Sequence, residues 1–314
     1  MLNFQPPGFE QRVTETHLGI MTYYTQTVPV DNPAPTLVFL HSLGGGSSAY
    51  EWSKVYGALA ADYAIIAPDL VGWGQSAHPA HSYQVEDYFK IITHLLETVL
   101  ARSATGIGVA APTGLDQPSR AIVIASSLTA GVVIRLAIQR PDLFQQLLLV
   151  SPAGNDDFGR GYRYTLPALL AGTPGLDQVV YGLGAANELA VTQFLATFLF
   201  AKADRITPET VAAYLASTLQ PNAQYSALAS LRGDICFDLA RYMAQLTVPT
   251  RIILGAESRL NPARQGERLA ALSTAVQSVQ VLPDLGVLPH VEYPAVVVGL
   301  LRGYLADRLS HTAQ

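Results

Sequence analysis

One strand-to-helix junction holds the pattern that most directly predicts chemistry. The β-branched run 122–124 leads through Ala125 into Ser126 and Ser127, and an apolar helical pattern follows at once. A serine on a sharp turn between a strand and a helix exposes its hydroxyl above the sheet, as a serine nucleophile requires. Glycines are expected two residues to either side of such a serine, but Ala125 and Thr129 stand there. The junction therefore predicts a nucleophile turn with altered flanks.

The elements around this junction alternate between strands and helices. Helical patterns occur near residues 51–61 and 85–102, from 128 onward and at 295–309. Such alternation is typical of a parallel sheet covered on both faces. We therefore expect an α/β fold with a mostly parallel eight-stranded sheet. Its predicted strands are 11–17, 20–28, 36–41, 64–68, 121–125, 147–151, 250–254 and 277–282.

Strand patterns vanish between residues 155 and 246, where helical periodicity takes over, for example at 188–201 and 208–219. This length suits a helical cap, or lid, inserted between the sixth and seventh strands. We expect residues 1–154 and 247–314 to form the core and residues 155–246 the cap. A segment rich in Gly, Ala, Pro and Ser, 103–119, is expected to be a surface loop at the end of the sheet opposite the junction.

The composition excludes several classes of protein. The 314 residues are 49% apolar and 14% charged, which excludes a disordered chain. A net charge of −5 offers no basic surface, so nucleic acid is not an expected partner. Cys236 is the single cysteine, which excludes an internal disulfide and a zinc site built from cysteines. It fits a reducing compartment, and we expect a cytoplasmic protein.

The chain carries no feature of secretion or membrane insertion. Its first residues lack a basic stretch followed by an apolar run, and no segment reaches about 18 uninterrupted apolar residues, so neither a secretory signal nor a transmembrane segment is expected. Mean hydropathy is nevertheless high at +0.24. The excess apolar character predicts a well-filled core, an apolar substrate pocket or contact with a membrane surface.

Four motifs, in this order, cover nearly the whole chain. They are the His-Ser-Leu-Gly-Gly loop at 41–45, the Pro-Asp-Leu-Val-Gly-Trp-Gly-Gln-Ser segment at 68–76, the junction helix continuing to 153, and Pro-His-Val-Glu-Tyr-Pro at 289–294. Together they resemble the α/β-hydrolase fold family, in the lidded branch that includes esterases, epoxide hydrolases and haloalkane dehalogenases. The resemblance implies hydrolytic ancestry with an ester-type substrate and a lidded apolar pocket.

The resemblance also assigns roles at the junction. Ser127 falls at the nucleophile position; an alternative register would make Thr129 the nucleophile but places the turn too far into the helix. The main-chain N–H groups of Leu43 and Leu128 are the implied oxyanion hole. Ser42 replaces a usual glycine and adds a hydroxyl beside the pocket, which we interpret as a local hydrogen bond rather than a substrate contact.

The acid and base positions of the family pattern are both replaced. Ser258 stands where the family has its aspartate, with Glu257 as an adjacent but displaced candidate. Val287 stands where the family has its catalytic histidine, and His290 matches the second, commonly structural, histidine. Losing the base of a Ser-His-Asp triad costs on the order of 10⁶ in turnover. Ordinary turnover is therefore not expected from the residues at these positions.

Three functions remain open on the sequence alone. The chain could bind a small apolar molecule or ester without turning it over. It could be a serine hydrolase that uses Ser127 with a displaced base such as His290. It could also perform chemistry without a serine nucleophile, such as a lyase step, with Ser42, Ser127 or Ser258 as hydrogen-bond donors. No cofactor and no metal is expected, since the sequence has no phosphate-binding Gly-rich motif and no cluster of metal ligands. The sequence does not indicate an oligomeric state.

Overall fold

The computed structural model describes residues 4–28, 30, 35–104, 120–173, 176–184 and 187–312. Most of the loop expected at 103–119 lies outside these ranges.

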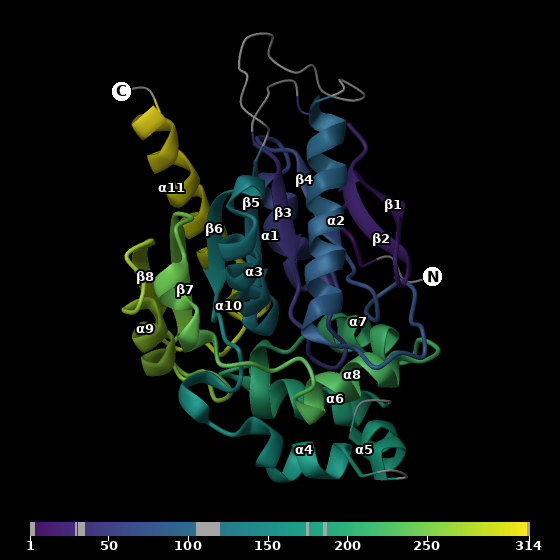
Figure 1. Ribbon diagram of the computed structural model, residues 1–314. Coiled ribbons are helices and arrows are strands. Elements are labelled where there is room, and N and C mark those ends of the chain that lie inside the picture. Colours follow the sequence, from purple (N-terminus) through teal and green to yellow (C-terminus); the bar gives the residue numbers. More distant parts are fainter. Residues whose placement is uncertain are drawn as a thin grey trace.

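Eight strands form one mixed sheet in the order β1-β2-β4-β3-β5-β6-β7-β8 (Figure 1). The sheet is antiparallel from β1 through β2 to β4 and parallel from β4 to β8. The eight-stranded, mostly parallel α/β sheet expected from the sequence is therefore confirmed. The strands are β1 (Phe9–Thr16), β2 (Gly19–Gln26), β3 (Leu37–Leu40), β4 (Ile65–Pro68), β5 (Ala121–Ser126), β6 (Phe144–Val150), β7 (Thr250–Gly255) and β8 (Val276–Leu282).

Helices bury both faces of the sheet because the central strands are apolar on both sides. In β5, Val123 and Ala125 pack with α2 (Val85–Ala104) and α3 (Ser127–Gln139), which lie in front of the sheet in Figure 1. Ile122 and Ile124 point the other way, into a second apolar cluster. That cluster is completed by α1 (Tyr50–Leu59) and α11 (Pro294–Thr312), and the short α10 (Pro289–Glu292) packs beside them, while α9 (Ala263–Ala270) adds to the first cluster.

The chain between β6 and β7, residues 151–249, contains further helices, and we call it the insertion. It holds α4 (Leu166–Ala171), α5 (Leu176–Gly184), α6 (Glu188–Phe194), α7 (Pro208–Thr218) and α8 (Ala223–Arg232), all below the sheet in Figure 1. Short 3₁₀ turns occur at Asp157–Gly159, Tyr162–Tyr164, Ala203–Arg205, Leu239–Arg241 and Met243–Gln245, and one more, Pro141–Leu143, precedes β6. The division into a core and a cap at residues 155 and 246 stays a prediction.

The helix expected at 188–201 differs from the structure in its second half. The α-helix ends at Phe194 and continues as a π-helical turn, Leu195–Leu199. Its wider winding accompanies the burial of Leu195, Leu199 and Phe200 in one apolar cluster. Hydrophobic periodicity alone does not distinguish this local widening from a regular helix.

Candidate functional site

The β5–α3 junction has the backbone geometry of a nucleophile turn. Ser126 is extended (φ −124°, ψ 150°), and Ser127, the first residue of α3, is left-handed with φ 53°. A non-glycine residue in this region is uncommon and strained, and such strain gathers at functional sites. The side chain of Ser126 is buried, whereas Ser127 is partly exposed. The turn therefore leaves Ser127, and not its neighbour, partly accessible.

Thr129 fits the turn in place of glycine because its hydroxyl has a specific partner. Thr129 is fully buried, and its Oγ1 donates to the main-chain oxygen of His41 at 2.6 Å. This bond joins the first turn of α3 to the loop after β3. Close packing is required two residues later, since a Cβ on Gly131 would collide with the carbonyl oxygen of Ala153. The replacement of glycine by Thr129 therefore leaves α3 closely packed against the ends of the strands.

His41 holds the loop after β3 through both ring nitrogens. Its Nε2 accepts from the N–H of Leu70 at 2.9 Å, so Nδ1 carries the proton and donates to the oxygen of Ser42 at 2.6 Å. Burial lowers the pKa of His41 to about 4, which keeps the ring neutral near pH 7. Its role is structural: it fixes the main chain on the approach to Leu43.

A buried carboxylate, Glu51, anchors the same loop. It accepts from the N–H of Ser42 at 2.8 Å, from the Ser42 hydroxyl at 2.9 Å and from the hydroxyl of Tyr214 at 2.9 Å. Burial raises the pKa of Glu51. The Ser42 hydroxyl thus makes local hydrogen bonds, with Ser47 as a further partner at 2.8 Å. Sequence reasoning missed Glu51, because an acidic residue in the first turn of a helix is ordinarily an exposed partner of the helix dipole.

The insertion contacts this loop and its neighbour through hydroxyl groups. Ser230 on α8 donates to the carbonyl oxygen of Leu43 at 2.6 Å, and Ser217 on α7 donates to that of Ser47 at 3.1 Å. Ser226 donates to the oxygen of Gly72 at 2.5 Å. Helices α7 and α8 are therefore attached directly to the loops after β3 and β4.

Two main-chain N–H groups near Ser127 have no hydrogen-bond acceptor among the described residues, as the donors of an oxyanion hole require. Leu128 lies in the first turn of α3, where N–H groups have no partner within the helix. Within the described residues, no hydrogen bond is donated by the N–H of Leu128 or of Leu43. The Thr129–His41 bond brings the two segments together. The arrangement is compatible with two donors for a negatively charged oxygen beside Ser127.

The structure brings the segments expected to hold the acid and base positions close to each other. The N–H of Glu257 donates to the oxygen of Leu285 at 2.9 Å, which ties the turn after β7 to the loop before α10. In that turn Ser258 is buried and its Oγ accepts from the N–H of Asn261, whereas Glu257 is exposed. The side chains of Glu257 and Ser258 therefore differ in direction, as expected for adjacent residues in a turn.

Val287 occupies an apolar environment at the base position. It is 1% exposed and packs in a cluster with Leu199, Phe200 and Tyr214 from the insertion. Its N–H donates to the oxygen of Leu199 at 3.1 Å. The valine side chain has no group that could accept a proton.

His290 lies against α1. Its ring stacks on the indole of Trp52, with centroids 3.7 Å apart and an interplanar angle of 13°. The side chain is fully buried, and neither ring nitrogen has a hydrogen-bond partner among the described residues. Burial lowers the pKa of His290 to about 3. Both properties are those of a core aromatic residue and not of a general base, which needs a pKa near the working pH.

A second buried carboxylate, Asp69, lies beside a cavity away from the serine. It accepts from the N–H groups of Ala49 and Gln75 at 2.7 and 2.8 Å and from the hydroxyl of Tyr24 at 3.1 Å. Burial raises the pKa of Asp69 to about 6. The cavity, of about 400 Å³, lies between the N-terminal segment and α7, and Ser127 is not among its lining residues.

The fold agrees with what comparison of the sequence finds. The profile of the Alpha/beta hydrolase family matches residues 37–300, which is most of the chain. The chain belongs to the alpha/beta hydrolase family. Proteins similar in sequence include the uncharacterized protein Rv2715 of Mycobacterium tuberculosis, which is 24% identical over 90% of this chain and 78% of its own length. Another is the Karrikin insensitive 2 receptor IA of Petunia hybrida, 21% identical over 88% and 93% of the two chains.

Solved structures show the same fold. Carboxylesterase CesB from Bacillus subtilis aligns with a TM-score of 0.72 at 16% identity, covering 97% of this chain and 94% of the esterase. A thermophilic esterase from Thermogutta terrifontis aligns with a TM-score of 0.72 at 18% identity, over 95% and 98%. At these identities the likeness establishes an alpha/beta hydrolase fold with helices inserted between β6 and β7.

The described residues offer neither a cluster of metal ligands nor a membrane-spanning helix. No group of three His, Cys, Asp or Glu side chains there is placed to hold a metal ion. In the same part of the chain, no helix combines the length and the apolar character needed to cross a membrane.

Proposed function

We propose that this hydrolase-family protein binds a small apolar ester or a similar apolar molecule at the Ser127 turn, under the cap of residues 155–246, without ordinary Ser-His-Asp turnover. The observation that carries the proposal is the placement of His290. The histidine that the sequence offers as a substitute base is stacked on Trp52, buried and held neutral. Val287, at the family's base position, lies in an apolar cluster.

The size of the loss in turnover that follows from a missing base supports a binding role. A serine hydroxyl is a weak nucleophile unless an adjacent base removes its proton. Without the base, turnover falls by about 10⁶, and the oxyanion hole with substrate binding leaves only about 10³–10⁴ over the reaction in water. The exposed Glu257 adds little to this residual activity, because members of a triad act as a unit.

The retained features support a ligand with a polarised oxygen. The left-handed turn at Ser127 and the unpaired N–H groups of Leu43 and Leu128 are suited to accept a carbonyl or carboxylate oxygen. The structural neighbours named as esterases favour an ester-type ligand, and the relative named as a receptor is compatible with a binding role on this fold.

The test is covalent labelling with a fluorophosphonate, which reacts with activated serines. We expect the wild-type protein to label no faster than Ser127→Ala, because the hydroxyl has no base. In parallel, short apolar esters should raise the melting temperature of the wild type and of His290→Phe alike.

Two results would contradict the proposal. Rapid labelling on Ser127 that disappears in His290→Ala would establish a serine hydrolase with a displaced base. Turnover of an apolar substrate that persists in Ser127→Ala would establish chemistry without a serine nucleophile.

A further inference from the structure

The insertion concentrates the exposed apolar side chains of this protein. Among the described residues, sixteen large apolar side chains are exposed, and ten of them lie between residues 164 and 225. Single exposed apolar residues are ordinary, but a contiguous group marks an interaction site. The six that belong to α4, α5 and the 3₁₀ turn before α4 form what we call the outer face: Tyr164, Leu166, Leu169, Leu170, Leu176 and Val179.

Helix α4 turns its large side chains outward. Its two alanines, Ala168 and Ala171, are buried, whereas Leu166 and Leu169 are 69% and 54% exposed. A surface helix of a water-soluble protein normally has the opposite arrangement, with its leucines toward the core. Because α4 packs on α8 and α5 through its small residues, its leucines are not part of the core. They are available to a partner outside the molecule.

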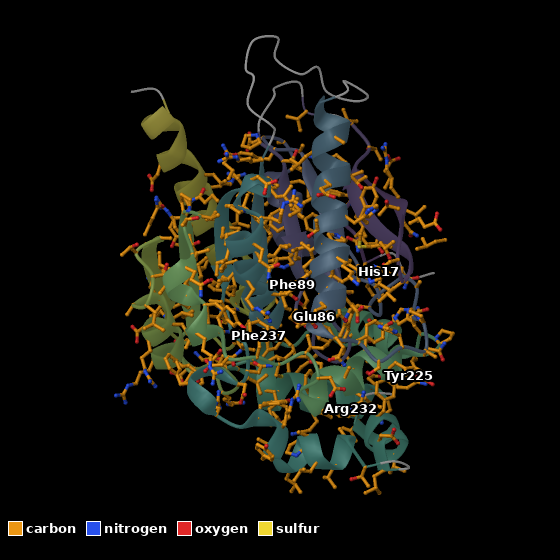
Figure 2. The ribbon with its side chains drawn as sticks, in the orientation of Figure 1. His17, Glu86, Phe89, Tyr225, Arg232 and Phe237 are labelled. Atoms are coloured by element: carbon orange, nitrogen blue, oxygen red, sulfur yellow. The ribbon has the colours of Figure 1, made fainter. Side chains whose placement is uncertain are left out.

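The position of α4 and α5 favours a partner with an extended surface. Figure 1 shows both helices along the lower border of the molecule, on the far side of the insertion from the sheet. Arg232 and Tyr225 of α8 lie above them in Figure 2. A partner could therefore contact the outer face without touching the sheet or the helices that cover it.

Few charged residues accompany the outer face in the sequence, and two of them are arginines just before α4. Between residues 164 and 187 the sequence has a single charged residue, Asp177. Immediately before this stretch come two exposed arginines, Arg160 and Arg163. Arg160 donates to the oxygen of Leu260 and to Gln265, and Arg163 donates to the oxygen of Gly233. Neither has a carboxylate partner in the described part of the chain.

We propose that the outer face docks on an anionic lipid surface. Its leucines would enter the boundary between head groups and acyl chains, Tyr164 would lie at head-group level, and Arg160 and Arg163 would meet lipid phosphates. Exposed apolar side chains with cationic groups beside them in the chain are suited to an anionic lipid surface. A second copy of the chain fits less well, because the same face of a partner offers the two arginines no cluster of acidic residues. Since no described helix can cross a membrane, the contact is peripheral.

Co-sedimentation with lipid vesicles tests this proposal on the full chain. We expect binding to vesicles of phosphatidylcholine and phosphatidylglycerol, weaker binding to phosphatidylcholine alone, and loss of the difference in high salt. Leu169→Ser/Leu170→Ser should weaken binding to the anionic vesicles by about tenfold or more, because the buried apolar area sets the affinity. Arg160→Gln/Arg163→Gln should abolish the preference for anionic lipid.

A matched control keeps the result specific. Val13→Ser/Ile20→Ser removes two side chains that are each 55% exposed on β1 and β2, and it should leave vesicle binding unchanged. The melting temperature of each variant shows that it is folded. Absence of binding to any vesicle, or equal binding by the leucine variant, would overturn the proposal. So would a dimer, measured by sedimentation equilibrium, that the leucine substitutions dissociate and that does not bind vesicles.

Discussion

His290 has the surroundings of a phenylalanine. It stacks on Trp52 inside the cluster between the sheet and α1, and its two ring nitrogens are buried without partners among the described residues. A buried polar group without a hydrogen bond costs about 1–3 kcal/mol. The stacking contact depends on the flat ring and not on the nitrogens. The histidine is therefore retained at a cost in stability that an apolar ring of similar shape would avoid.

His290→Phe is accordingly expected to stabilise the protein by about 1–3 kcal/mol at pH 7, because the ring still stacks and the unpaired nitrogens are gone. Urea unfolding of the two proteins measures the difference. His290→Ala serves as the control and should destabilise by about 2–4 kcal/mol through the cavity that it leaves. A loss of stability in His290→Phe would show that the nitrogens have a functional or structural partner.

The same substitution has a pH dependence of known sign. The pKa of His290 falls from about 6.5 in the unfolded chain to about 3 in the folded one, so the unfolded state binds the proton first. The free energy of unfolding is therefore not reduced by this titration above pH 6.5. It decreases as the pH falls from 6.5 toward 3, because protonation then favours the unfolded chain. The advantage of His290→Phe should therefore widen as the pH falls from 7 to 5, measured by urea unfolding at each pH. A constant difference would contradict the burial of the ring.

How far the sequence predicts the site depends on the range of each interaction. The turn at Ser127 follows from a local pattern, whereas the roles expected at positions 258 and 287 rest on motif spacing and stay predictions. The burial of Glu51 beneath Tyr214 does not follow from a local pattern, because Tyr214 reaches Glu51 only after the insertion has folded onto the core. No local signal distinguishes a buried carboxylate with distant partners from an exposed one.

The junction between β5 and α3 depends on one close approach. Helix α3 lies so near the strand end that a Cβ on Gly131 would meet the oxygen of Ala153, whose N–H in turn donates to Ser127. The helix is thus positioned by contact with the chain after β6. The conformation of Ser127 depends on this packing, since a left-handed serine persists only where its surroundings enforce it.

Gly131→Ala should therefore destabilise the protein by about 1–3 kcal/mol, because the helix must move away from Ala153. Gly299→Ala is the matched control: this glycine is also inside a helix, α11, and has open space at its Cβ position. It should stabilise by up to about 1 kcal/mol through helix propensity. Thermal unfolding of both variants gives the comparison, and equal shifts would refute the close approach.

Most elements were predictable because their apolar residues are regularly spaced. The expected strands and helices match the observed ones to within a few residues, for example 121–125 against Ala121–Ser126 and 208–219 against Pro208–Thr218. The π-helical turn Leu195–Leu199 was not predictable, because it depends on fitting three side chains into a cluster built from distant segments. The spacing of apolar residues predicts which face of a helix is buried, but not whether a given turn is α-helical or π-helical.

At the scale of the whole molecule, hydroxyl groups join the insertion to the core, beside an apolar cluster that both share. Ser226 and Ser230 on α8 donate to the oxygens of Gly72 and Leu43, and Tyr214 on α7 donates to Glu51. These partners lie in the loops after β3 and β4 and at the start of α1, at the same edge of the sheet as Ser127. The inner helices of the insertion are therefore expected to unfold together with the sheet and not as a separate lid.

Ser226→Ala/Ser230→Ala should lower the free energy of unfolding by about 2–4 kcal/mol, because it leaves two carbonyl oxygens without their partners. It should also speed hydrogen exchange in α7 and α8 relative to β5. Thr173→Ala is the control, since its hydroxyl donates to Leu169 within the insertion and is exposed, and its effect should stay within about 0.5 kcal/mol. Independent unfolding of α7 and α8 in the wild-type protein would contradict this coupling.

The bond between Thr129 and His41 has a practical consequence for protein engineering. It keeps the serine turn and the neighbouring N–H donors in register through a side chain that takes no part in proton transfer. Under the proposed function, charge stabilisation and proton transfer are thus separable in this chain, with the second to be supplied at positions 258 and 287. A library randomised at those two positions leaves the turn untouched, so directed evolution of an esterase could start from a geometry that is already in place.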